Sequence, residues 1–248
     1  RDRLRSRGLG DVYKRQIQDM TSGSPGRLII LFAIPLMLGN ICQQLYTMVD
    51  TMVVGQVAGV EALAALGAVD FLMWVVTGIS TGLTQGFSIQ LSQYYGAKDF
   101  ENLRKSLAHS YRLTAFIAAG VLILSQSFAS LVLTGLHTPS NIIGMSLLYL
   151  RIIFCGIPAT AAYNMFASAL RAMGNSKTPL TAMIIASVLN VSLDILFVAG
   201  FGWGVAGAAI ATVIAQSFSA VYCFLILRRI DIVHPVSYTH LRAHETGA

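Results

Sequence analysis

The stretch LIILFAIPLMLGNICQQLYTMVDTMVV, residues 28–54, decides the fold class of this chain. It is long enough to cross a bilayer as an α-helix, and Asp50 is its only charged residue. Ser24-Pro25-Gly26 marks the start of the helix, and Pro35 inside it is expected to produce a kink. An acid within such an apolar run is costly in lipid, so Asp50 is by default a candidate functional residue.

The composition extends this interpretation to the whole chain. Of the 248 residues, 55% are hydrophobic and 11% are charged, and the mean hydropathy is +0.66. Soluble domains carry about 25% charged residues, so we predict an all-α integral membrane protein. The apolar runs predict six membrane spans, at approximately residues 28–54, 62–87, 113–133, 145–170, 180–198 and 205–227, and Pro158 lies inside the fourth.

The connections between these spans alternate in charge. The connections that follow the second and fourth spans and the end of the sixth span carry Lys and Arg, whereas the other connections have none. The basic residues are Lys98, Arg104, Lys105, Arg171, Lys177, Arg228 and Arg229. By the positive-inside rule, we expect both ends of the chain in the cytoplasm and a multi-pass protein of the bacterial plasma (inner) membrane.

Residues 17–235 are expected to form one transmembrane bundle, and the two ends differ from it. Residues 1–16 are polar and basic, residues 236–248 are equally unlike the bundle, and we expect both segments to be non-native tails. The first tail holds six Lys or Arg and two Asp, which is +4 of the net charge of +6. The basic balance therefore indicates no nucleic-acid partner.

No enzyme signature is present in the sequence. Cys42, Cys155 and Cys223 lie far apart in apolar runs, without a CxxC or a Cys/His cluster, so neither a disulfide nor zinc is indicated. The GxSxG, HExxH and P-loop motifs are missing as well. We expect a protein that is not an enzyme and needs no cofactor other than a transported ion.

Three spans carry polar stripes at helical spacing. The first span has Gln43, Tyr46 and Asp50, the fifth has Ser187, Asn190 and Asp194, and the sixth has Thr212, Gln216 and Ser219. Counting 1.5 Å per residue places Asp50 and Asp194 at the same depth, about 7–8 Å below the outer interface. Because lipid cannot satisfy polar groups, the stripes are expected to face one another or a water-filled cavity.

Two chemistries suit such a cluster. Paired carboxylates in a medium of low dielectric can bind and release a proton near neutral pH. Oxygen atoms of Asp50, Asn190, Asp194 and Thr212 could instead hold Na⁺. The alternative is interhelical hydrogen bonding without a further function, which is the better interpretation for Ser187, Gln216 and Ser219.

Two further charged residues lie within the spans. Asp70, in the second span, is a weaker candidate for the wall or the rim of the same cavity. Arg151, in the fourth span, could extend its charged group to the outer surface or pair with an acid, and the first interpretation is favoured.

The chain resembles the multidrug and toxic compound extrusion (MATE) family over about residues 17–233. The matching motifs are Pro35, Gln43, Tyr46, Asp50 and Gly55; Gln93-x-x-Gly96-Ala97-Lys98-Asp99; the run from Leu170 to Pro179; Asn190-x-x-x-Asp194; and Gly204-x-x-Gly207-Ala208-Ala209-x-Ala211-Thr212. This order and spacing of motifs is specific to the family.

The resemblance implies an antiporter that expels organic cations and drugs against H⁺ or Na⁺. The coupling-ion site of the family corresponds to Tyr46, Asp50, Asn190, Asp194 and Thr212, with Gln43, Asp70 and Gln216 as further candidates for the cavity wall. The family has twelve helices, so this chain corresponds to the N-lobe, a six-helix bundle. We expect its missing partner to be a C-terminal six-helix bundle.

Two alternatives remain open. One is a lipid-linked oligosaccharide flippase of the same superfamily, which would need Arg or Lys in its cavity to bind pyrophosphate. Only Arg151 lies within a predicted span, which disfavours the flippase. The other alternative is a structural membrane subunit. An intramembrane prenyltransferase is excluded because the chain has no DDxxD-like cluster of acids.

Overall fold

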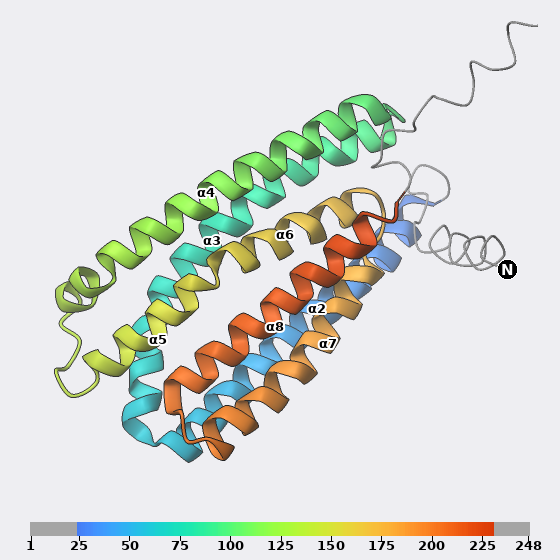
Figure 1. Cartoon of the computed structure of the whole chain (residues 1–248). Coiled ribbons are helices and arrows are strands. Elements are labelled where there is room, and N and C mark those ends of the chain that lie inside the picture. Colours follow the sequence, from blue (N-terminus) through green and yellow to red (C-terminus); the bar gives the residue numbers. More distant parts are fainter. Residues whose placement is uncertain (1–23, 231–248) are drawn as a thin grey trace, which may run out of the picture.

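The computed structural model describes residues 24–230, which form a bundle of long helices (Figure 1). The predicted tails at residues 1–16 and 236–248 lie outside the described residues. The elements are α2 (Pro25–Val53), α3 (Val60–Gly96), α4 (Phe100–Gly135), α5 (Ile143–Cys155), α6 (Ile157–Ala172), α7 (Lys177–Asp194) and α8 (Gly204–Leu227), with short π-helices η1 (Val54–Ala58) and η2 (Ile195–Gly200). No strand occurs between residues 24 and 230, and the all-α prediction is confirmed.

The six predicted spans are present, but the fourth is broken. Five helical segments are each long and apolar enough to cross a membrane, and α5 and α6 together make the sixth span with a bend of 44°. Gly156 lies at the break, and Pro158 lies in the first turn of α6, where its missing N–H costs nothing. A Cβ at Gly156 would lie 2.7 Å from Val213 Cγ2, so α8 also approaches the break closely.

α3 and α4 are longer than their predicted spans. They contain 37 and 36 residues, which is about 55 Å at 1.5 Å per residue, whereas a bilayer core is about 30 Å thick. Their surplus lies toward the connections at residues 97–99 and 173–176 (Figure 1), which we call the basic end. The connections at residues 59, 136–142 and 201–203 form the opposite end of the bundle.

Hydrogen-bonded caps stop three of the helices. α3, α4 and α6 are each followed by a residue with positive φ: Lys98 (58°), His137 (55°) and Gly174 (81°). At each cap the two N–H groups of this residue and the next return to carbonyls in the last helical turn. This is the Schellman arrangement, which satisfies the terminal carbonyls and reverses the chain within a few residues.

The helices pack as two outer pairs with α6 and α8 between them. α3 lies beside α4, α2 lies beside α7, and α8 packs on both α6 and α7 (Figure 1). The largest buried cluster lies toward the basic end and includes Leu91, Leu103 and Leu170. A smaller cluster at the opposite end joins the two π-helices to α8 through Val54, Val198 and Val205. Buried apolar contacts therefore hold both ends of the bundle, and the polar stripes lie between them.

Candidate functional site

Asp50 and Asp194 lie on adjacent helices and are both buried. Asp50 is in the second-last turn of α2 and is 6% exposed, and Asp194 is the last residue of α7 and is fully buried. α2 and α7 pack against each other along their length (Figure 1), although the two residues are 144 positions apart in the sequence. The two carboxylates are close enough to interact electrostatically. The stripes on the two helices therefore face inward together.

Polar partners from three helices surround this pair. Asn190, 1% exposed on α7, donates from Nδ2 to Thr212 Oγ1 on α8 at 3.3 Å. Gln216, one turn further along α8, donates from Nε2 to the Tyr46 hydroxyl on α2 at 3.3 Å. These four side chains line one small gap together with Met183, Ala186 and Ala215. The gap thus brings together Tyr46, Asn190 and Thr212 of the predicted coupling-ion site. Asp50 and Asp194 lie one turn beyond Tyr46 and Asn190 on their helices and do not line the gap.

Several oxygen atoms of this cluster accept no hydrogen bond from residues 24–230. They are Asp50 Oδ1, Asn190 Oδ1, both carboxylate oxygens of Asp194 and Gln216 Oε1. A buried oxygen that accepts no hydrogen bond raises the free energy of the folded state, and a charged oxygen does so most. A proton or a hard cation would satisfy them, because oxygen ligands suit both. No group of three or more His, Cys, Asp or Glu gathers within the described residues.

A π-helix follows each of the two acids. η1 begins four residues after Asp50, and η2 begins directly after Asp194. Such wide turns are rare and occur often at functional sites. They lie in contact with each other at the opposite end of the bundle. Both acid-bearing helices therefore change their winding at the same depth.

The other predicted polar residues have different environments. Asp70 is exposed on α3 and belongs to neither the gap nor the large cavity described below. Ser187 donates to the Met183 carbonyl in its own helix at 2.8 Å. Ser219 donates from α8 to the Ala182 carbonyl on α7 at 3.5 Å, which is an interhelical hydrogen bond of the kind expected for it.

Tyr149 on α5 is a residue that the sequence analysis missed. It lies within electrostatic reach of Asp50, Asp70 and Asp194, and its half-buried ring packs against two of the buried clusters. The sequence gives little indication of this role, because the only polar residue one turn away from Tyr149 is Ser146, and no acid or amide continues a stripe on α5. Only the packing of α5 across α3 and α8 places it near the acids.

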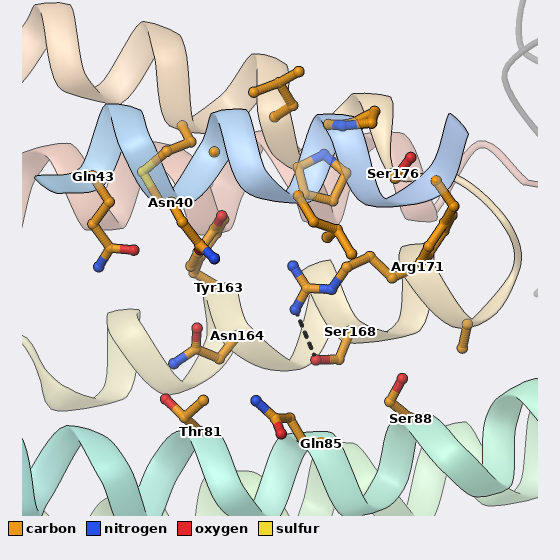
Figure 2. A pocket seen from close by; sticks show the side chains of 18 of the residues that line it. Asn40, Gln43, Thr81, Gln85, Ser88, Tyr163, Asn164, Ser168, Arg171 and Ser176 are labelled. Carbon is orange, nitrogen blue, oxygen red and sulfur yellow. Dashed lines mark hydrogen bonds between the residues drawn. The ribbon is translucent and has the colours of Figure 1, made fainter. Parts of the chain in front are cut away.

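A cavity of about 660 Å³ lies between α2, α3, α6 and α7 and extends toward the basic end (Figure 2). Gln43 and Gln216, both predicted for a cavity wall, line it, and so does Pro35. Because Gln216 also lines the gap beside Tyr46, the cavity adjoins the acid site. Figure 2 shows further polar side chains around it, including Asn40, Thr81, Gln85 and Asn164.

Arg171 also lines this cavity, which corrects the sequence analysis. It was assigned to a basic connection, but it lies in the last turn of α6 and its guanidinium extends among the cavity residues in Figure 2. Arg151, the only arginine predicted within a span, is exposed on α5 and is not part of this cavity. The side-chain direction of a residue at a span end cannot be deduced from charge counting, and this is why Arg171 was missed.

Comparison with known proteins supports the resemblance found in the sequence. A family model described as MatE matches residues 35–196. The chain belongs to the MatE family. The matched residues include α2 from Pro35 onward, both acids of the pair and Arg171, so the family match covers most of the site.

Two bacterial relatives of this MatE chain are named as probable multidrug resistance proteins. The probable multidrug resistance protein YoeA of Bacillus subtilis is 31% identical over 225 residues, 89% of this chain and 48% of that protein. The probable multidrug resistance protein NorM of Thermotoga maritima is 27% identical over 208 residues, 81% of this chain and 44% of that protein. The chain thus spans about half the length of the curated relatives it matches.

Solved MATE structures share the fold. A crystal structure of MATE in the bent conformation has a TM-score of 0.80 and 26% identity, covering 86% of this chain and 48% of that one. The outward-facing conformation of a multidrug resistance MATE family transporter has a TM-score of 0.81 at the same identity and coverage. The helices of this chain therefore form the N-lobe arrangement of a MATE transporter.

Proposed function

We propose that this chain is the N-terminal half of a secondary active multidrug efflux transporter. It would export organic cations and drugs in exchange for H⁺ or Na⁺ across the bacterial plasma membrane. The names of its relatives, its MatE membership and its fold support this proposal. The buried pair Asp50 and Asp194, with carboxylate oxygens that accept no hydrogen bond within residues 24–230, is the single observation that carries the ion coupling.

The acid pair would act as the coupling site. Binding of a proton or Na⁺ at Asp50 and Asp194 neutralises charge that is otherwise costly in this buried setting. The Asn190–Thr212 bond joins α7 to α8, and the Gln216–Tyr46 bond joins α2 to α8. Asn190, Thr212 and Tyr46 would add oxygen atoms around the ion. Because α2 and α7 pack against each other, neutralising this charge would directly change how the two helices pack.

A bend in α2 would connect ion binding to drug release. Pro35 has no backbone N–H, so α2 lacks one hydrogen bond at this point. Because Pro35 also lines the cavity, a bend there would change the volume of the cavity. A MATE relative has been crystallised in a bent and in a straight conformation, which supports such a motion. We propose that α2 bends when the pair is protonated, which shrinks the cavity and releases the drug outward.

Complete transport would need a second bundle. Alternating access in transporters of this kind is a movement of one bundle against the other. The relatives are about twice as long as the matched region, which leaves room in them for the second bundle. The C-terminal six-helix bundle is therefore proposed as the partner of this chain.

The coupling role is tested by substitution in the transporter that contains both bundles. Asp50→Asn and Asp194→Asn keep the side-chain shape but remove the titratable group, and each should abolish ion-driven dye efflux from cells while the protein remains in the membrane. Glu61→Gln is the matched control, because Glu61 is an exposed carboxylate at the same end of the bundle. Efflux that persists in both Asp variants would remove the coupling role.

The coupling ion is tested on this chain alone. Titration of Na⁺ into the detergent-purified chain at pH 8 should release heat if Na⁺ binds, and Asp50→Asn should abolish that heat. If Na⁺ produces no heat, proton uptake measured on acidification of the unbuffered chain should be smaller in Asp50→Asn than in wild type. A variant that matches wild type in both measurements would contradict ion binding at this pair.

A flippase for lipid-linked oligosaccharides remains the second candidate. The argument against it was the lack of a cavity cation, and Arg171 now supplies one. Reconstitution into liposomes separates the candidates: an antiporter moves a cationic dye against an ion gradient, whereas a flippase moves a fluorescent lipid pyrophosphate without one. A structural subunit would move neither.

A further inference from the structure

The large cavity has an apolar part and a polar part. Phe32, Pro35 and Leu36 of α2 form the apolar part, and Asn40 and Gln43, further along α2, are polar. α3 and α6 contribute uncharged polar side chains, among them Gln85 and Asn164 (Figure 2). A volume of about 660 Å³ is within the range of drug-sized binding sites. The cavity therefore suits an amphipathic molecule that has an apolar body and a polar group.

Arg171 is the one charged side chain among the residues that line this cavity. Its Nη2 donates to Ser168 Oγ at 3.1 Å, one turn earlier on α6. The only ion pair within residues 24–230 joins Lys105 to Glu101, so no carboxylate lies within ion-pair distance of Arg171. The half-buried guanidinium of Arg171 has five N–H donors, and within the described residues its hydrogen-bond acceptor is one neutral hydroxyl, that of Ser168.

The end of α6 does not compensate for this charge by hydrogen bonding. A helix C-terminus favours a nearby cation through its free carbonyls. Here the carbonyls of Ala169, Leu170 and Arg171 each accept a backbone N–H from residues 173–175. These carbonyls are therefore already hydrogen-bonded within the capping turn. The remaining N–H groups of the Arg171 side chain can bind a molecule in the cavity.

We propose that this cavity, within the transporter function proposed above, binds substrates that carry an anionic oxygen group, and that Arg171 binds this group. A carboxylate or a phosphate matches the planar fork of a guanidinium with two parallel hydrogen bonds. Asn164 on α6 and Gln85 on α3 also line the cavity and can hydrogen-bond the rest of the group (Figure 2). Phe32, Pro35 and Leu36 of α2 contact the apolar body of the molecule.

This proposal distinguishes zwitterionic from purely cationic cargo. Gln216 lines both the large cavity and the small gap, and the acid pair lies beyond it, away from the basic end. Arg171 and the acid pair therefore lie at opposite ends of the space formed by the cavity and the gap. A zwitterion can present its anionic group to Arg171 and its basic group toward the acids. A permanent cation without an anionic group gains no hydrogen bond from Arg171.

The test compares two dyes that differ by one ester. Tetramethylrhodamine carries a free carboxylate, whereas its methyl ester is a cation of nearly the same shape. Fluorescence anisotropy of each dye is measured with the full chain in detergent. Arg171→Gln should weaken binding of the free acid by about tenfold, the typical value of a charge-assisted hydrogen bond, and leave the ester within about twofold.

Control variants separate this effect from misfolding. Arg151→Gln removes the same charge from an exposed position outside the cavity and should bind both dyes as wild type does. Arg171→Lys keeps the charge but loses the fork, so it should show a smaller loss for the free acid alone. Equal losses for acid and ester in folded Arg171→Gln or Arg171→Lys, or no loss for either dye, would overturn the proposal.

The source of the anionic group is distinguished by competition with the free-acid dye. Dihexanoyl phosphatidylglycerol and glycerol phosphate share the phosphate, but only the first has acyl chains. Displacement by the lipid alone assigns the site to a membrane lipid, and equal displacement by both assigns it to a soluble anion. Because these measurements use no ion gradient, a negative result leaves the tests of Asp50 and Asp194 unaffected.

Discussion

Asn175 shows how a single side chain fixes the start of a helix that carries the site. It is 2% exposed, and its Oδ1 accepts the Thr178 N–H at 3.0 Å, which satisfies one of the free donors at the start of α7. Asp194 and Asn190 are at the other end of the same helix, so their depth depends on where α7 begins. The cap therefore contributes to the geometry of the acid site.

We expect Asn175→Ala to destabilise the chain by about 1 kcal/mol, because the substitution leaves a buried N–H without its acceptor. The measurement is the midpoint of thermal unfolding in detergent, followed by helical circular dichroism. Asn141→Ala is the control, since Asn141 is exposed and its bond to Glu61 is long at 3.3 Å. Equal midpoints for the two variants would contradict the capping role.

Asp99 caps α4 in the connection at the basic end, outside the membrane-spanning segments. Its carboxylate accepts hydrogen bonds from the Asn102 side chain at 2.7 Å and the Asn102 backbone N–H at 3.1 Å, and these bonds lower the pKa of Asp99. A lowered pKa in the folded state means that the stabilisation is present above the ordinary Asp pKa of about 4 and is lost as pH falls through the folded pKa.

Asn102→Ala should move the Asp99 pKa back toward the ordinary Asp value, because it removes the largest cause of the shift and leaves the backbone bond and the smaller effect of Lys105. Carbon NMR of labelled aspartate across pH 2–6 measures the shift. Lys105→Ala provides the comparison, since its charge has a smaller effect on Asp99 and should change the titration less. An Asp99 titration that is the same in Asn102→Ala and wild type would refute this account.

The inward position of the polar residues could be predicted from sequence, whereas the position of Arg171 could not. Lipid chains cannot hydrogen-bond the side chains of Asp50, Asn190 or Asp194, so these side chains are expected to point into the bundle. Arg171 belongs to a short basic segment at a span end, where water, headgroups and a cavity are all open to a long side chain. Only the packed structure decides among these environments.

At the scale of elements, α8 packs very closely against η2. A Cβ at Gly207 would lie 3.0 Å from both the carbonyl carbon and the Cβ of Phe197. Backbone atoms cannot rotate away as a side-chain end can, so this close approach requires glycine. The contact joins the π-helix that follows Asp194 to the first turn of α8.

Gly207→Ala should therefore destabilise the chain by about 1–3 kcal/mol, the usual cost of overpacking. Gly120→Ala is the matched control, since an added Cβ at Gly120 in α4 meets nothing within 4 Å and alanine favours helix. Thermal unfolding in detergent measures both variants. A loss of stability in Gly120→Ala as large as in Gly207→Ala would show that the close approach is not the cause.

Hydropathy located the spans, but it could not give the lengths of the helices. The polar ends of α3 and α4 continue as helix beyond any bilayer thickness, because helix formation needs hydrogen bonds and caps rather than apolar residues. The bend at Gly156 was also missed, since a glycine and a proline inside an apolar run can produce a kink or a complete break. The packing of α8 at this point determines which of them occurs.

At the scale of the whole molecule, the orientation in the membrane stays a prediction from charge. The structure places Lys98 and Lys177 at one end of the bundle and the connection at residues 136–142, which has no Lys or Arg, at the other. The positive-inside rule therefore gives a definite expectation for each connection.

Cysteine labelling of intact cells tests this orientation. In a chain whose three cysteines are replaced by Ala, Ser140→Cys should react with a membrane-impermeant maleimide from outside. Lys98→Cys should react only after the membrane is permeabilised. Both positions are in exposed connections, so each serves as the control for the other. The reverse pattern would invert the topology and place the basic end outside.

The paired π-helices have a mechanical consequence for the whole bundle. A π-helical turn contains more residues than an α-helical turn. Each acid-bearing helix therefore has extra residues in the turn just beyond its carboxylate. Rewinding such a turn would rotate the neighbouring segment by about 100° per residue without melting the helix or breaking the bundle. Since η1 and η2 touch, a change of pitch in one would alter its contact with the other.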